Sequence, residues 1–72
     1  MQTLLFNTTT KEVKLYEDKK QQSELLAMHT NVPTVRISEQ GYYEVMKKLD
    51  DEDKSIPVLR VPIANTNMII EK

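Results

Sequence analysis

The sequence of 72 residues has no cysteine, no tryptophan, one glycine and one histidine. Without cysteine the chain forms no disulfide and offers no thiolate to a metal. A zinc site or a general base would need companions for His29, so we interpret this residue as a surface or helix-end histidine. The sole glycine, Gly41, excludes Gly-rich phosphate loops and the nucleophile elbow of hydrolases. We therefore predict a protein that is not an enzyme and that uses no metal or cofactor.

Long apolar runs and an excess of basic charge are also missing. No stretch approaches the ~20 apolar residues that span a bilayer, and the N-terminal residues MQTLLFN lack the basic lead of a signal peptide. These features predict a cytoplasmic protein. Ten lysines and arginines stand against 11 aspartates and glutamates, which argues against a nucleic-acid partner, although a dimer could still concentrate a few basic residues on one face.

The most clearly patterned stretch is Val32–Leu49. Polar and apolar residues alternate over Thr34–Ile37, which predicts a strand. Ser38 is suited to cap a helix, because its hydroxyl can accept a backbone N–H of the first turn. Apolar residues then recur three or four positions apart, which predicts an amphipathic helix that buries Tyr42, Val45, Met46 and Leu49.

Gly41 bears on where that helix begins. A glycine inside a helix costs about 1 kcal/mol relative to alanine. Either Ser38–Gly41 forms a turn and the helix starts after it, or another segment packs closely against the glycine. If Tyr42 lies in the core, Tyr43 points to the opposite side and is exposed.

Five further elements are predicted on the two sides of this stretch. A strand that begins at Leu4–Phe6 and a second strand over Glu12–Tyr16 are joined by the polar link Asn7–Thr10, which is of hairpin length. The segment Asp18–Met28 is rich in helix formers and predicts a short helix. For its first half, Lys19–Gln22, a solvated connection is the alternative. The strand Ile56–Ile63 carries two prolines, which confine it to a sheet edge or to bulges. Met68–Ile70 predicts a last short strand.

The acidic run Asp50–Asp53 is interpreted as a solvated loop. It lacks the glycine and the final glutamate of an EF-hand calcium loop.

The predicted order is strand, strand, helix, strand, helix, strand, strand. This order indicates one small α+β domain over residues 1–72, with a mostly antiparallel sheet and one or two short helices on one face. The predicted core is formed by Leu4, Phe6, Val13, Leu15, Leu25, Met28, Val35, Ile37, Tyr42, Val45, Met46, Leu49, Leu59, Val61, Ile63 and Ile70.

The sixteen residues TVRISEQGYYEVMKKL resemble the start of a ribbon-helix-helix DNA-binding protein, in which a short strand pairs with that of a dimer mate. The resemblance implies that Thr34, Arg36 and Ser38 face the major groove. The chain departs from the family further on, because the second helix would fall on a segment that contains Pro57 and Pro62.

The favoured function is a small accessory or inhibitor protein, of bacterial or phage type, that docks on another protein. A chain this short has little stability to spare without disulfides. The three apolar side chains of Met68–Ile70 cannot all point to one core, because successive side chains of a strand alternate. We therefore expect a homo-oligomer, with a dimer favoured. The predicted interaction surface consists of Tyr16, Arg36, Tyr43, Met68, Ile69 and Ile70.

Overall fold

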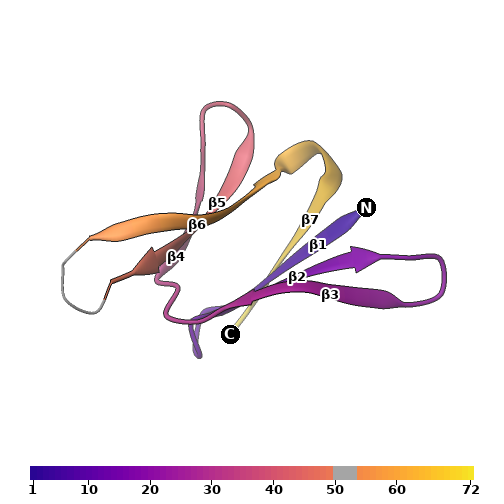
Figure 1. The fold of residues 1–72 in the computed structure, drawn as a ribbon, viewed down its shortest axis with the longest axis horizontal. Helices are drawn as coiled ribbons and strands as arrows, with labels where there is room; N and C mark the ends of the chain where they lie inside the picture. Colours follow the sequence, from indigo (N-terminus) through magenta and orange to yellow (C-terminus); the bar gives the residue numbers. More distant parts are fainter. Residues whose placement is uncertain (50–53) are drawn as a thin grey trace.

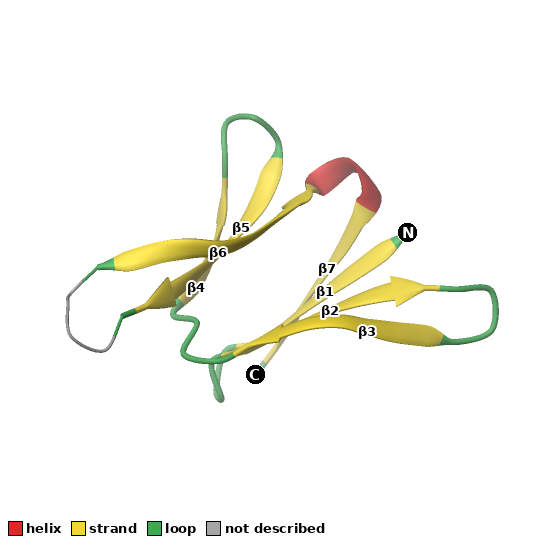
Figure 2. Ribbon diagram, viewed as in Figure 1, coloured by secondary structure: helices red, strands yellow, loops and turns green. Residues whose placement is uncertain are grey.

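The computed structural model describes residues 1–49 and 54–72, and these residues are almost entirely β-structure (Figure 2). The predicted loop Asp50–Asp53 lies outside the described residues. The elements in chain order are β1 (Gln2–Asn7), β2 (Glu12–Asp18), β3 (Ser23–His29), β4 (Thr34–Ile37), β5 (Tyr42–Lys48), β6 (Ser55–Pro62), a single 3-10 turn η1 (Ile63–Asn65) and β7 (Thr66–Glu71).

The strands form two sheets (Figure 1). Sheet A has the order β3-β2-β1-β7, and sheet B has the order β4-β5-β6. Neighbouring strands are antiparallel except β1 and β7, which run parallel with Leu5 beside Ile69. The chain crosses from sheet A to sheet B between β3 and β4 and returns through η1, so its first and last strands lie side by side.

The core lies between the two sheets. Its side chains come from alternate positions of the strands, as expected when each sheet buries one face. The buried cluster consists of Leu4, Phe6, Val13 and Leu15 from sheet A, Val45 and Val61 from sheet B, and Val32 from the link between the sheets. All but Val32 were predicted from the sequence. Four residues of the predicted core are instead exposed, namely Leu25, Met28, Ile37 and Ile70.

The predicted α+β class is wrong, since residues 1–49 and 54–72 contain no α-helix. The expected helix after Ser38 is strand β5, and the turn Ser38–Gly41 joins it to β4 as an antiparallel hairpin. Gly41 has φ 87°, a conformation that suits glycine. The Ser38 hydroxyl does accept the Tyr42 N–H, at 3.1 Å, but it closes a hairpin turn and not a helix. The architecture implied by the ribbon-helix-helix resemblance is therefore not formed.

The second predicted helix is also a strand. β3 pairs antiparallel with β2, and the register shifts beside Leu15 and Tyr16, so that Leu26 is an extra residue on β3. The backbone hydrogen bonds of this ladder outweigh the helix propensity of individual residues. Lys19–Gln22, left open as a solvated connection, forms the exposed end of the β2–β3 hairpin.

The predicted hairpin between the first two strands is confirmed. Its polar link is tightened by Asn7, whose side-chain oxygen accepts the N–H groups of Thr9 and Thr10 at 2.9 and 3.0 Å. Lys11 follows in the left-handed region, with φ 61°, and leads the chain into β2.

Candidate functional site

The outward face of sheet A is unusually apolar for a surface. Leu4, Phe6, Val13 and Leu15 point to the core, so the residues between them in the strands point away from it. Leu25, Met28 and Ile69 on this outward side are 51%, 49% and 45% exposed. We call the outward apolar side chains of sheet A the apolar face; they are Leu5, Tyr16, Leu25, Met28 and Ile69.

The strand registers bring these five side chains together. Leu5 on β1 lies beside Ile69 on β7, and Tyr16 on β2 lies beside Leu25 on β3. Leu5 is also paired with Lys14, and Lys14 with Met28. Apolar side chains therefore extend over all four strands of the sheet, with Lys14 as the charged residue among them.

Acidic side chains border the apolar face at the C-terminal end of β1. There Asn7 is paired with Glu12 on one side and with Glu71 on the other. Within residues 1–49 and 54–72, neither glutamate takes part in a salt bridge, and neither does Lys14.

At the opposite end of the apolar face, hydrogen bonds join side chains of β1, β2 and β3. The Thr3 hydroxyl donates to one carboxylate oxygen of Asp18 at 2.5 Å, and the Ser23 hydroxyl donates to the other at 3.1 Å. The bond from Thr3 is the main cause that holds the pKa of Asp18 below its ordinary value, with a smaller contribution from Ser23.

The outward face of sheet B is polar and internally paired. Glu44 lies between Arg36 and Arg60 in the strand registers. One oxygen of Glu44 accepts from Nε and Nη2 of Arg36 at 3.1 and 2.9 Å, and the other oxygen lies 3.2 Å from Nε of Arg60. Arg60 also lies over the Tyr42 ring, 4.6 Å from its centroid. We call these four residues the arginine cluster.

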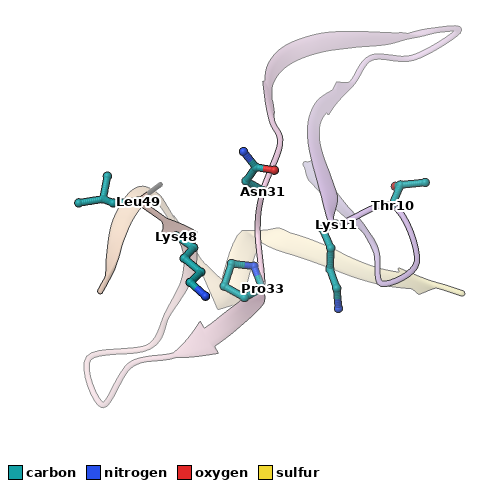
Figure 3. A pocket seen from close by; sticks show the side chains of 6 residues that line it. All are labelled: Thr10, Lys11, Asn31, Pro33, Lys48 and Leu49. Carbon is teal, nitrogen blue, oxygen red and sulfur yellow. The ribbon is translucent and has the colours of Figure 1, made fainter. Parts of the chain in front are cut away.

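A hollow of about 450 Å³ opens where the β1–β2 turn, the link between the sheets and the end of β5 meet. Figure 3 shows Lys11 and Lys48 on either side of Pro33, with Asn31 nearby. Lys11, Asn31, Pro33 and Lys48 are all exposed. No buried polar side chain among the residues that line it fixes a ligand there, which distinguishes this hollow from a specific binding pocket.

The structure brings together only some of the residues predicted as an interaction surface. Tyr16 and Ile69 belong to the apolar face, and Arg36 belongs to the arginine cluster on the other sheet. Tyr43 and Met68 are half-buried and pack against the core, whereas Tyr42 faces outward, the reverse of the predicted orientation of the two tyrosines.

Leu5, Leu25 and Met28 were missed as surface residues. The sequence predicts Leu25 and Met28 as core residues of a helix, and this helix is not formed. The run Leu25–Met28 indicates their exposure. It contains three large apolar side chains within four residues, and one side of a strand can bury only two of four successive side chains.

The described residues contain no group of three or more histidines, cysteines and carboxylates placed to hold a metal ion. None of their helical segments is long and apolar enough to cross a membrane. Comparison of the chain with protein-family models, with curated proteins and with solved structures finds no match.

Proposed function

We propose that the protein is a non-enzymatic docking module that binds another protein through the apolar face of sheet A. The observation that carries the proposal is the exposure of about half of each of Leu25, Met28 and Ile69 on one continuous side of a sheet. Contiguous apolar surface on a small protein favours association, because its transfer from water is worth about 25 cal/mol per Å².

The charges around the face define the partner's chemistry. A partner that fits presents a flat apolar surface with a carboxylate opposite Lys14 and basic side chains opposite Glu12 and Glu71. Complementary charges of this kind set orientation and association rate, while the apolar contact supplies most of the affinity.

Site-specific photo-crosslinking tests the proposal. A photoreactive amino acid replaces Met28 on the apolar face or, as the matched control, Thr34, an exposed residue on the outward side of sheet B. We expect one discrete protein adduct from position 28 and none from position 34, and loss of the adduct when Leu25→Asp is added. Equal adducts from both positions, or none from either, would contradict the proposal.

The ribbon-helix-helix resemblance implies DNA binding instead. A gel shift with mixed duplex at two salt concentrations distinguishes DNA binding from binding to a protein. Tight binding that weakens steeply with salt and is lost in Arg36→Ala would favour DNA over a protein partner. We expect no such shift, because the arginines of the cluster are already engaged by Glu44.

A further inference from the structure

The four edge strands of the two sheets are protected to different degrees. β6 carries Pro57 and Pro62, and β4 is only four residues long and follows Pro33. β3 has a bulge and carries Glu24. These are the devices by which proteins prevent an edge from pairing with another chain. β7 is six residues long and has no proline, no bulge and no charge before its last residue, Glu71.

The backbone of β7 offers hydrogen bonds at its free side. The Glu71 carbonyl accepts the Thr8 N–H at 2.8 Å, so the polar groups of Glu71 face β1. Backbone N–H and C=O groups of successive strand residues point to alternate sides, so those of Met68 and Ile70 face away from β1. β1 is the one strand that pairs with β7 in the described part of the chain.

The side chains of β7 leave apolar surface on both faces of this edge. Ile69 points outward beside Leu5 and is 45% exposed. Ile70 points to the core side beside Phe6 and is nevertheless 61% exposed, because sheet A ends there. A strand added at this edge would cover both side chains at once.

We propose that this strand is β7 of a second copy, paired antiparallel about a two-fold axis perpendicular to the sheet. Such an axis keeps core-side residues opposite core-side residues. With Ile69 opposite Ile69 of the second copy, Met68 lies opposite Ile70 in both directions, and Asn67 lies opposite Glu71. A shift by two residues would place Ile69 opposite Asn67 or Glu71 and lose apolar pairs, so the sequence of β7 selects the first register.

This register also satisfies the backbone. Met68 and Ile70, whose polar groups face the free edge, form the hydrogen-bonded pairs, and the two Ile69 residues form the close, non-hydrogen-bonded pair between them. The two four-stranded sheets become one continuous sheet, and the apolar faces of the copies meet at Ile69. Ile69 belongs to both surfaces, but the dimer is argued from the edge of β7 alone, and Leu25 and Met28 on the opposite edge strand stay exposed for the docking function proposed above.

Charge exchange at position 69 tests both the dimer and its register. Ile69→Lys and Ile69→Glu each place two like charges in contact across the two-fold axis. In sedimentation equilibrium we expect the unmodified protein to be a dimer, each variant alone a monomer, and an equimolar mixture of the two variants a dimer again. The control Leu25→Lys, a similarly exposed site on β3, retains the dimer.

A cysteine at the same position gives a second measurement that holds even if a charged variant unfolds. The chain has no cysteine of its own, and paired residues at a non-hydrogen-bonded site are about 4.5 Å apart at Cα, within disulfide reach. Under diamide, Ile69→Cys should form a covalent dimer and Asn67→Cys should not. A monomeric unmodified protein, unchanged dimers of the Ile69 charge variants, or failure of Ile69→Cys to crosslink would each overturn the proposal and leave docking by the apolar face untouched.

Discussion

The outward faces of the two sheets satisfy their side chains in different ways. On sheet B, Glu44 is buried between Arg36 and Arg60, and each of its oxygens is engaged. On sheet A, the outward side chains include the apolar face, in which Met28 is 49% exposed. Long polar side chains cover the outer surface of sheet B, whereas apolar side chains stay exposed on the outer surface of sheet A.

The difference shows how a chain of 72 residues divides its surfaces. Strand β5 carries core residues on one side and Glu44 and Met46 on the other, so it is buried on both faces and anchors the fold. The strands of sheet A are buried on one face only. Sheet B therefore contributes the strand that is buried on both faces, and sheet A contributes the exposed apolar face.

The largest expected effect is at the centre of β5. Val45 is fully buried, and Val45→Asp places an unpaired charge in the core. We expect a loss on the order of 4 kcal/mol or more in the free energy of unfolding, enough to unfold the protein. Lys47→Ala on the same strand should cost only a few tenths of a kcal/mol. Thermal melts followed by circular dichroism measure both, and equal melting temperatures would show that the core side of β5 is misassigned.

Substitution of two methionines compares the burial of the outward faces of the two sheets directly. Met46 on sheet B is 6% exposed and Met28 on sheet A is 49% exposed, although both point away from the core. Met46→Ala should lower the free energy of unfolding by about 2 kcal/mol or more, as for other buried methionines. Met28→Ala should change it by less than about 0.5 kcal/mol. Urea denaturation gives both values, and similar losses would remove the contrast between the faces.

The arginine cluster provides a third comparison. Glu44→Gln keeps the shape of the side chain but removes the charge, and we expect a loss of about 2 kcal/mol in urea denaturation. The matched control is Glu24→Gln, which breaks the pair with Lys19 at 2.7 Å. The Glu24 side chain is 56% exposed and that of Glu44 is 12% exposed, so the control should cost under about 0.5 kcal/mol. A cost of the control as large as that of Glu44→Gln would contradict the proposed role of the cluster.

The smallest expected effect concerns Asp18 at the end of the apolar face. Its folded pKa is lowered mainly by the Thr3 hydrogen bond, so the stabilisation is present above the pKa of the unfolded state and is lost as the pH falls through the folded pKa. Thr3→Val should therefore raise the pKa of Asp18 in an NMR titration, and Thr3→Ser should leave it low. An unchanged pKa in Thr3→Val would show that this hydrogen bond is not the main cause.

Five of the strands and most of the core could be predicted from the sequence, but the prediction of a helix over β5, the central strand of sheet B, is wrong. Residues Glu44, Val45 and Met46 are consecutive and all buried, because β5 is covered on both faces. The alternation typical of a strand is lost there, and the remaining apolar spacing resembles that of a helix. The aromatic and β-branched residues of Tyr42–Val45 favour a strand. In the sequence, this preference is a weaker signal than the helix-like spacing of the apolar residues.

The candidate site could be predicted only in part. Ile69 was identified because three successive apolar residues cannot all face one core. Leu25 and Met28 were hidden by the bulge in β3, which adds Leu26 to the strand and disrupts its alternation. The pairing of Arg36 with Glu44 depends on the register of a hairpin, and no local pattern reveals that register.

The most direct test of the contrast between the faces is the affinity for the protein that crosslinks to position 28. The dissociation constant is measured by isothermal titration for the unmodified protein, for Met28→Lys and for Arg36→Ala. We expect Met28→Lys to weaken binding at least about tenfold, or about 1.4 kcal/mol, and Arg36→Ala to change it less than about twofold. A larger loss from Arg36→Ala than from Met28→Lys would place the binding surface on sheet B and contradict the proposed docking by sheet A.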